Sequence, residues 1–444
     1  MTQVYTNTDN ILEKKLDYLQ NLGNEYWSFK GNSTREYSHG LFRYPAMMVP
    51  QMVRRILHEI HDVFPSIKTV SDPFMGSGTI LTESMLQGFD FFGNDINPMA
   101  VLLGKTKSGP FHINALKEKS ILLFERLDND SKKIIEVSFS GIDKWFREDV
   151  QYDLSQIKRA IHQEKSKWAR RFFWVALAET IRLTSNSRTT TYKLHKRCDE
   201  EIKTREIHVI KLFNKILLRN INLFENQAEK MKESQLLSKG YFTEHINIKL
   251  GDTRELEFDQ KSDLIITSPP YGDNTTTIPY GQYSYLPLQW IDLEDIEENL
   301  DPEYLKTTSE IDARSLGGSK RISQETFELL NDKSPALRSY LEKIRRQPED
   351  RKKRVLAFFR DLDVCIEPIL KTLKPGGLMV WTLGNRNVGG VRVPLDLILF
   401  ELFKTYDVTL LATLTRNIES KRMAIKNKTA NTMSSEIILV LRKA

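Results

Sequence analysis

The hydrophobic pattern near the beginning of the chain predicts a strand, a helix and a second strand in succession. Apolar residues first recur at helical spacing over residues 51–60, after a segment that contains two prolines. The elements predicted next are a strand at 67–70, a glycine-bearing turn at 72–78, a helix at 79–87 and a second strand at 90–93. This order is typical of a β-α-β unit with parallel strands.

A long charged segment follows this unit. Between residues 109 and 238 the apolar residues repeat at helical period. One apolar stripe there consists of Trp168, Phe172, Val175, Ala176 and Ile181. We interpret the whole segment as a helical insertion.

Strand patterns resume at residues 246–250 and 264–267, and the second run ends directly at Ser268. An acidic stretch at 292–303 and a stretch with glycine and lysine at 313–321 then predict a second insertion. The last part of the chain predicts a helix at 355–373, a turn at 374–377, a strand at 378–383, a helix at 394–403 and two strands, at 408–414 and 436–441.

These elements predict an α/β protein with a doubly wound, Rossmann-like sheet that is interrupted by two insertions. A chain of 444 residues exceeds the size at which one hydrophobic core stops growing, so added modules are expected. We divide it into an N-terminal arm (1–40), the first half of a core (41–104), the helical insertion (105–240), a core segment with a distinctive loop (241–290), the second insertion (291–350) and the C-terminal half of the core (351–444).

Composition narrows the function classes only a little. Hydrophobic residues make up 40% of the chain, enough for a folded core, and the formal net charge of +6 is compatible with a polyanionic partner. Cys198 and Cys365 lie far apart and outside metal-ligand spacing, so the sequence predicts neither a disulfide framework nor a metal site. We find no signal segment and no apolar run of membrane-spanning length, and therefore expect a protein of the cytoplasm.

A turn with two glycines lies where the first predicted strand leads into a helix, and it reads Asp72-Pro73-Phe74-Met75-Gly76-Ser77-Gly78-Thr79. Such a turn lets a ligand approach the backbone, although taken alone it is more often an ordinary strand-to-helix connection. Asp95 favours a ligand, because a carboxylate at the end of the next strand can accept hydrogen bonds from both ribose hydroxyls of an adenosine cofactor. Ile96 would cover the adenine. A dinucleotide is disfavoured because the third glycine of its fingerprint is missing.

The most specific feature is the segment Thr267-Ser268-Pro269-Pro270-Tyr271 at the end of an apolar strand. Two consecutive prolines remove two backbone donors and fix φ, so carbonyl oxygens are presented without competing N–H groups. Ser268 adds a hydroxyl that can accept from an amine, and Tyr271 adds a flat face on which an extracted base can stack. The aromatic residues that follow are candidates either for the base pocket or for the core, namely Tyr280, Tyr283, Tyr285 and Trp290.

Together, segments 72–79 and 267–271 resemble the cofactor motif and the catalytic motif of the DNA amino-methyltransferases. The resemblance implies S-adenosylmethionine as cofactor and Ser268, Pro269, Pro270 and Tyr271 as catalytic residues. Segment 42–46 resembles the element that these enzymes place beside the methionine part of the cofactor, and Gly251-Asp252 resembles their acid near the adenine amine. The implied cofactor-binding residues are Tyr44, Pro45, Asp72, Phe74, Gly76, Ser77, Gly78, Thr79, Asp95, Ile96 and Asp252.

Serine at the first position of the catalytic motif resembles the cytosine-N4 branch of the family, whereas aspartate or asparagine is commoner in the adenine-N6 branch. The motif order departs from many cytosine-N4 members, because here the cofactor motif comes first. We expect methylation of the N4 amine of cytosine, with the N6 amine of adenine as the alternative. Carbon 5 of cytosine is disfavoured because it requires a cysteine nucleophile, and neither cysteine lies on a suitable loop.

The expected partner is double-stranded DNA, and a base inside a duplex must be flipped out to reach such a loop. Segments 185–193 and 313–321 combine hydroxyl, amide and cationic groups that suit DNA, although each is equally typical of a solvated surface loop. We expect DNA contacts in the helical insertion and target recognition in the second insertion. The candidate DNA-binding residues are Arg188, Lys193, Arg314, Lys320 and Arg321.

By resemblance, the wider role is modification within a restriction-modification system, with a cognate endonuclease as partner, although a solitary methyltransferase would look the same. An RNA amino-methyltransferase and a noncatalytic DNA-binding protein on the same fold are the remaining alternatives. No recognisable RNA-binding module supports the first, and the intact Gly76, Gly78, Asp95 and catalytic motif disfavour the second.

Overall fold

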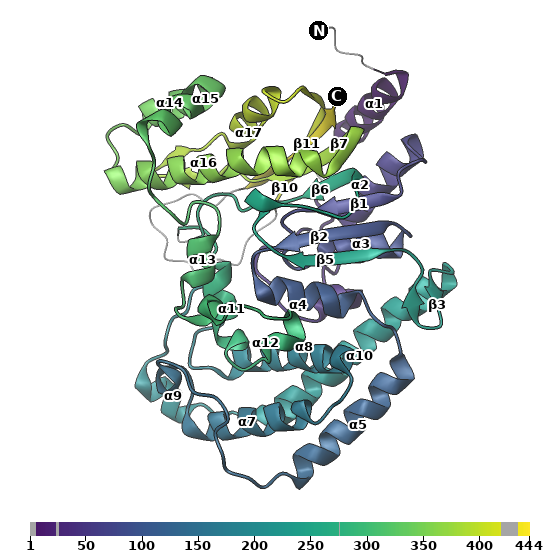
Figure 1. Cartoon of the computed structure of the whole chain (residues 1–444), viewed down its shortest axis with the longest axis vertical. Coiled ribbons are helices and arrows are strands. Elements are labelled where there is room, and N and C mark those ends of the chain that lie inside the picture. The colour runs from purple at the N-terminus through teal and green to yellow at the C-terminus, as the bar shows by residue number, and fades with distance from the viewer. Residues whose placement is uncertain (1–5, 24–25, 275, 419–433) are drawn as a thin grey trace.

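The computed structural model describes residues 6–23, 26–274, 276–418 and 434–444. Its centre is a seven-stranded sheet in the order β10-β11-β7-β6-β1-β2-β5 (Figure 1). Neighbouring strands are parallel from β5 to β7, whereas β11 is antiparallel to both β7 and β10. The strands span Thr69–Asp72 (β1), Asp90–Asp95 (β2), Ile246–Leu250 (β5), Ser262–Thr267 (β6), Leu373–Leu383 (β7), Val408–Asn417 (β10) and Ser435–Lys443 (β11). The predicted doubly wound α/β fold is confirmed.

The strand order reverses at β1, and this reversal positions the site. The chain places β2 and β5 on one side of β1 and later returns to place β6 and β7 on the other. In such sheets a crevice opens at the carboxyl ends of the strands next to the reversal. Asp72 ends β1 and Thr267 ends β6, and the Thr267 hydroxyl donates to Asp72 Oδ1 at 2.7 Å. The predicted cofactor turn and catalytic loop are therefore neighbours in space.

Both faces of the sheet are covered, as the near-continuous apolar strands predict. In β6, Leu264 and Ile266 pack into one hydrophobic cluster and Ile265 packs into the other, which is the period of two of a strand. The first cluster includes helices α2, α3 and α4, and the second includes α16 and α17 (Figure 1). Their bounds are Pro50–Val63 (α2), Thr79–Leu86 (α3), Pro98–Lys107 (α4), Glu349–Lys371 (α16) and Leu395–Lys404 (α17).

The N-terminal segment is helical and belongs to the same core. Helix α1 (Asn7–Asn21) begins at a capping box, in which Thr6 and Asp9 bond each other's backbone N–H. Its buried face carries leucines at helical spacing, at positions 12, 16 and 19, and the helix packs against α2 and β10.

The long charged segment folds as helices, with the bounds Ile113–Asn129 (α5), Ile142–Trp145 (α6), Glu148–His162 (α7), Lys167–Thr184 (α8), Asp199–Thr204 (α9) and Val209–Glu233 (α10). The single apolar stripe predicted for α8 was too narrow. Phe173, Trp174 and Leu177 are also fully buried, because α4, α7, α10 and α11 all pack around this helix. Apart from α9, these helices share one hydrophobic cluster with the sheet. None of the described helices is long and apolar enough to cross a membrane.

The segment after the catalytic loop contains short helices that its composition did not predict. They are Tyr280–Leu288 (α11), Leu293–Ile296 (α12), Glu310–Arg314 (α13), Gln324–Lys333 (α14) and Pro335–Lys343 (α15). The turn predicted at 374–377 was wrong, because these residues lie inside β7, where the pairing with β6 shifts register. Smaller elements are η1 (Tyr37–Gly40), β3 (Leu237–Ser238), β4 (Tyr241–Phe242), η2 (Thr253–Glu255), η3 (Pro302–Leu305), β8 (Asn387–Val388) and β9 (Val391–Arg392).

Candidate active site

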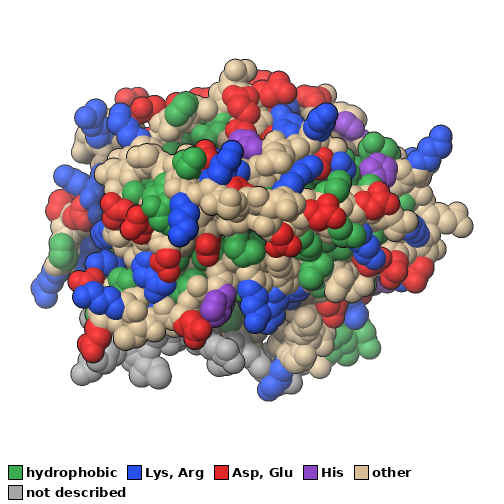
Figure 2. All heavy atoms as spheres, turned by 90° about the horizontal axis from the view of Figure 1, so that it is seen from below, with side chains coloured by type: hydrophobic (Ala, Val, Ile, Leu, Met, Phe, Trp, Pro, Cys, Tyr) green, Lys and Arg blue, Asp and Glu red, His purple; other side chains and the backbone are tan. Residues whose placement is uncertain are grey.

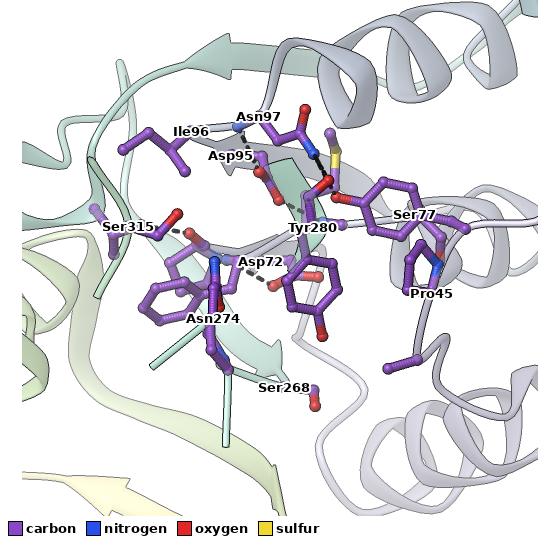
Figure 3. Close-up of a pocket in the computed structure, with 18 of the residues that line it drawn as sticks. Pro45, Asp72, Ser77, Asp95, Ile96, Asn97, Ser268, Asn274, Tyr280 and Ser315 are labelled. Atoms are coloured by element: carbon purple, nitrogen blue, oxygen red, sulfur yellow. Dashed lines mark hydrogen bonds between the residues drawn. The ribbon is translucent and has the colours of Figure 1, made fainter. Parts of the chain in front are cut away.

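A cleft of about 880 Å³, including the part open to solvent, lies at the carboxyl ends of β1, β2 and β6. Figure 3 shows the cleft with side chains that reach it from segments far apart in the sequence. The predicted site residues that line it are Tyr44, Pro45, Asp72, Phe74, Gly76, Ser77, Thr79, Asp95, Ile96, Asp252, Ser268, Pro270 and Arg314. The predicted residues Gly78, Pro269 and Tyr271 are outside this lining.

Asp95 ties the end of β2 to the glycine turn after β1. Its two carboxylate oxygens accept hydrogen bonds from the backbone N–H groups of Gly76, at 2.7 Å, and Asn97, at 2.8 Å. Burial raises the pKa of Asp95 to about 6, against the lowering effect of these backbone donors. Gly76 has a φ of +51°, a conformation that suits glycine. The carboxylate is thus held in place at the cleft and keeps acceptor capacity for a ligand hydroxyl.

Asp72 links the cofactor turn to the catalytic loop. Its Oδ1 accepts from the backbone N–H of Phe74 at 3.0 Å, in addition to the Thr267 hydroxyl. Burial is the largest effect on this carboxyl and raises the pKa of Asp72 to about 7. Asp72 holds two strand ends together rather than standing free in the cleft.

Asn97 is a cleft residue that the sequence reasoning missed. Its Nδ2 donates to the hydroxyl of Tyr44 at 3.0 Å and to Ser284 Oγ at 2.8 Å, while its Oδ1 caps α4 by accepting from Met99 N. The ring of Tyr44 also stacks on Tyr280, with centroids 5.8 Å apart. The sequence signal was Asn97 directly before Pro98, which is typical of a helix start.

Lys107 is buried beneath the glycine turn, which the sequence also did not indicate. Its ammonium donates to the backbone oxygen of Ser77 at 2.7 Å. Burial lowers the pKa of Lys107 to about 7, while the nearby Glu83 carboxylate opposes this shift. Because the contact is to backbone, Lys107 supports the turn without entering the cleft.

Asp252, predicted to bind the adenine amine, lines the cleft and is paired with Arg254. The Arg254 backbone N–H donates to Oδ1 at 2.9 Å, Nη2 donates to Oδ2 at 2.5 Å, and Nε lies 2.9 Å from both oxygens. A carboxylate offers roughly four acceptor positions. Because these are three N–H donors, the carboxylate keeps acceptor capacity at the cleft.

The catalytic loop carries a chain of hydrogen bonds. The Tyr271 hydroxyl donates to Glu436 Oε1 at 3.2 Å, and Ser268 Oγ lies 3.2 Å from the same hydroxyl oxygen. Burial and Glu436 raise the pKa of Tyr271, so its hydroxyl stays protonated and its one proton goes to the carboxylate. Ser268 must then donate to Tyr271, which leaves the Ser268 lone pairs as its remaining polar function.

The second insertion forms a wall of the cleft through Ile311, Ser315 and Leu316, which sequence reasoning also missed. Its Asp312 accepts from the backbone N–H groups of Gly281, at 2.8 Å, and Gln282, at 3.0 Å. These are first-turn amides of α11, so the carboxylate caps that helix. The insertion thereby fixes the position of Tyr280, which lines the cleft, whereas Tyr283, Tyr285 and Trp290 are buried in the core.

The predicted DNA-binding residues lie on two surfaces. Arg188 is exposed and pairs with Glu201 at 2.8 Å, and Lys193 is exposed in the same loop. Lys320 pairs with Asp350, and Arg321 is exposed beside it. Arg314 differs from the others, because it lines the cleft and pairs with Glu310 and Asp301 at 3.0 and 3.3 Å. Among the described residues, no group of three side chains is arranged to hold a metal ion.

Comparison with known proteins identifies the family. Residues 2–105 match the family described as DNA methylase. The chain is 35% identical over 460 aligned residues to Type II methyltransferase M.MvaI of Kocuria varians, covering 98% of this chain and 97% of that protein. This chain belongs to the DNA amino-methyltransferase family. The DNA methyltransferase also matches Type II methyltransferase M.MjaII of Methanocaldococcus jannaschii, with 31% identity over 22% of this chain and 18% of that protein.

A solved rRNA methyltransferase, aviRa of Streptomyces viridochromogenes, covers 90% of this DNA methyltransferase and 86% of its own chain, with 10% identity and a TM-score of 0.31. That likeness is too low to bear on function. The cofactor of this DNA methyltransferase is S-adenosylmethionine. The cleft fits it, because Asp95 keeps acceptor capacity for a ribose and Gly76 carries no β-carbon at the turn.

Proposed function

We propose that this DNA methyltransferase methylates the exocyclic N4 amine of cytosine in duplex DNA. The observation that supports this proposal is the hydrogen-bond chain from Ser268 through Tyr271 to Glu436. It leaves an uncharged acceptor at the first position of the catalytic loop. Serine at this position, rather than aspartate or asparagine, is the feature that favours cytosine over adenine.

The proposed role of Ser268 follows from the chemistry of the amine. The N4 lone pair is delocalised into the cytosine ring, so the amine is a weak nucleophile. As the nitrogen attacks a methyl carbon, its protons become more acidic and bond more strongly to acceptors. Ser268 Oγ and the carbonyl of Pro269 would therefore stabilise the transition state more than the ground state.

S-adenosylmethionine supplies an activated methyl group on a sulfonium. When bound, it would give this methyl carbon to the amine and keep the S–C electron pair as a neutral thioether, while one amine proton would go to an acceptor or to water. Asp95 and Ser268 both line the cleft (Figure 3), so the ribose bound at Asp95 and the amine bound at Ser268 would be held within one site.

We further propose that DNA lies along the loop of residues 185–197, which contains Arg188 and Lys193. This loop packs on α11 beside the cleft, where Leu194 N donates to Gln282 Oε1 at 2.9 Å and the Tyr192 ring meets Tyr283 at 5.8 Å. The face of the helical region in Figure 2 carries intermixed positive and negative side chains, which does not favour a phosphate backbone. The cleft side is therefore the better candidate.

The test is to incubate the protein with unmethylated duplex DNA and S-adenosylmethionine, digest the DNA to nucleosides and identify the methylated base by mass spectrometry. We expect N4-methylcytosine. N6-methyladenine would keep the family and overturn the proposed base, while product on RNA alone would overturn the DNA substrate. Bound cofactor with no product on either polymer would favour a noncatalytic protein.

A role in restriction-modification predicts methylation at one short sequence. We expect DNA from cells that produce the wild type to carry methylcytosine at every copy of that sequence, and DNA from cells producing the Ser268→Ala variant to lack it. Single-base methylation sequencing provides this measurement. Methylation scattered without a common sequence would contradict the proposal that this is a modification enzyme with a cognate endonuclease.

A further inference from the structure

Four arginines from three segments of the chain gather on the surface beside the cleft. Arg182 is on α8 and Arg219 is on α10, two helices that pack together below the sheet (Figure 1). Arg35 precedes η1, which packs on α10, and Arg43 stands directly before the cleft residue Tyr44. We call these four residues the arginine cluster.

Hydrogen bonds to the backbone bring these segments together. Nη2 of Arg219 donates to the backbone oxygen of Leu41 at 3.4 Å, two residues before Arg43. The backbone oxygen of Arg43 accepts from the Tyr283 hydroxyl at 2.5 Å. The Tyr283 ring also meets that of Tyr192, with centroids 5.8 Å apart. The arginine cluster is therefore continuous with the loop that we propose to contact DNA.

The chain does not balance the positive charge of the arginine cluster. Glu179 lies among these residues, and Arg182 occupies both of its oxygens, with Nε 2.9 Å from Oε2 and Nη2 2.6 Å from Oε1. Arg35, Arg43 and Arg219 are exposed and form no ion pair with any residue that the structure describes. Three guanidinium groups are thus left without a counter-ion.

The guanidinium groups repel one another. Burial lowers the pKa of Arg219, Glu179 opposes this shift, and Arg35 and Arg182 lower the pKa further. Holding like charges together costs free energy, which an anion bound between them recovers. The planar fork of a guanidinium matches the oxygens of a phosphate. The surface therefore suits a ligand that carries several phosphates.

We propose that Arg35, Arg43 and Arg219 bind backbone phosphates of duplex DNA and hold the duplex while the target base enters the cleft. Duplex DNA carries one negative charge for about every 1.7 Å of helix axis, so one duplex can engage all three arginines. This inference rests on the proposed duplex DNA substrate and not on which base is methylated.

The experiment measures the affinity for duplex DNA by fluorescence anisotropy over a series of salt concentrations, with S-adenosylhomocysteine present so that no methyl group is transferred. Each phosphate contact contributes about 0.9 to the slope of log K against log salt. The triple variant with Arg35→Gln, Arg43→Gln and Arg219→Gln should therefore reduce this slope by about 2 to 3. Affinity should fall alike for target and unrelated duplexes, because phosphate contacts carry no sequence information. An unchanged slope would overturn the proposal.

A second triple variant controls for the change in net charge. It replaces three lysines with glutamine, each of which pairs with a glutamate at 2.6, 3.1 or 2.8 Å and lies outside the cleft lining, namely Lys117, Lys230 and Lys371. The slope of this control should match that of the wild type. An equal fall in both triple variants would show that net charge, and not contact at the arginine cluster, controls binding.

The carboxylate of the cofactor is the competing anion for Arg43, because the neighbouring Tyr44 lines the cleft. Calorimetry with S-adenosylhomocysteine, without DNA, tests this alternative. The arginine variant should bind this ligand as the wild type does, and a tenfold loss would assign Arg43 to the cofactor and overturn the proposal.

Folding is checked by thermal unfolding of each variant. If the triple arginine variant does not fold, Arg43→Gln alone takes its place, with an expected loss of about 0.9 in the slope. A slope loss that is seen with RNA and not with duplex DNA would overturn the DNA assignment. An adenine-N6 product would overturn the proposed function while leaving this binding result unaffected.

Discussion

The hydroxyl of Tyr271 donates to the carboxylate of Glu436 at 3.2 Å, and this bond connects the catalytic loop to the last strand of the sheet. Arg416 on the neighbouring strand holds the other Glu436 oxygen at 3.3 Å. The catalytic loop is therefore oriented from β10 and β11 as well as from its own strand β6. In this arrangement Tyr271 directs the proton of Ser268 away from the cleft and leaves the serine lone pairs to face a substrate.

Tyr271→Phe tests this relay. The ring would be kept for base stacking while the bond to Glu436 is lost, so the Ser268 hydroxyl is free to rotate. We expect kcat to fall about fivefold to tenfold, the value of one ordinary hydrogen bond, with cofactor affinity unchanged. Tyr271→Ala should cost more, because base stacking adds on the order of 1–3 kcal/mol. Steady-state kinetics on duplex DNA measure kcat for both variants. Equal losses of kcat would show that the hydroxyl, and not the ring, accounts for the whole contribution of Tyr271.

Ser268→Ala should weaken methyl transfer with little effect on cofactor affinity. The variant removes an acceptor that strengthens as the amine protons become acidic, so we expect single-turnover rates to fall at least about tenfold. Calorimetry with S-adenosylhomocysteine gives the cofactor affinity. A large loss of that affinity with methyl transfer otherwise intact would place Ser268 in the cofactor site instead.

Cofactor binding should weaken as the pH falls through about 6. Burial raises the pKa of Asp95 to about 6, so the carboxylate is ionised above this pH and protonated below it. A protonated carboxyl is a poorer acceptor for ribose hydroxyls. If only the ionised form binds, the dissociation constant should rise about tenfold for each pH unit below 6.

Two variants assign that pH dependence. Asp95→Asn should bind weakly at pH 8 and show no step near pH 6. Asp72→Asn should keep the step, because Asp72 has its own pKa of about 7 and faces Thr267 rather than a ligand hydroxyl. A step that survives in Asp95→Asn would show that another group controls binding.

The two motifs allowed the position of the crevice to be predicted, because their strands end at one sheet edge once the order reverses at β1. With the segments that the family resemblance added, half of the lining was predicted. Local sequence gave no signal for contacts that depend on a distant segment. Lys107 looks like a solvated helix residue until the turn at Ser77 covers it. Asp252 lines the cleft as predicted, and its pairing with the nearby Arg254 was not predicted.

Lys107 should make the stability of the fold depend on pH in the alkaline range. Burial lowers its pKa to about 7 in the folded protein, against a reference value of 10.5. Between these two values the unfolded chain binds more protons than the folded one, so the free energy of unfolding rises with pH across this window. We expect the melting temperature of the wild type to contain a component that increases from pH 7 to pH 9.

Lys107→Met should remove that component, because methionine has a similar length and carries no proton. The lost bond to the Ser77 oxygen costs about 1 kcal/mol, and the removed desolvation of the ammonium offsets this at pH 7. Lys105→Met on the same helix is the matched control, since Lys105 pairs with Glu297 at 2.7 Å and is less buried. Differential scanning fluorimetry across pH measures all three proteins. If Lys107→Met and Lys105→Met retain the same pH dependence as the wild type, then Lys107 does not titrate in this window and the turn is supported by a fully charged lysine.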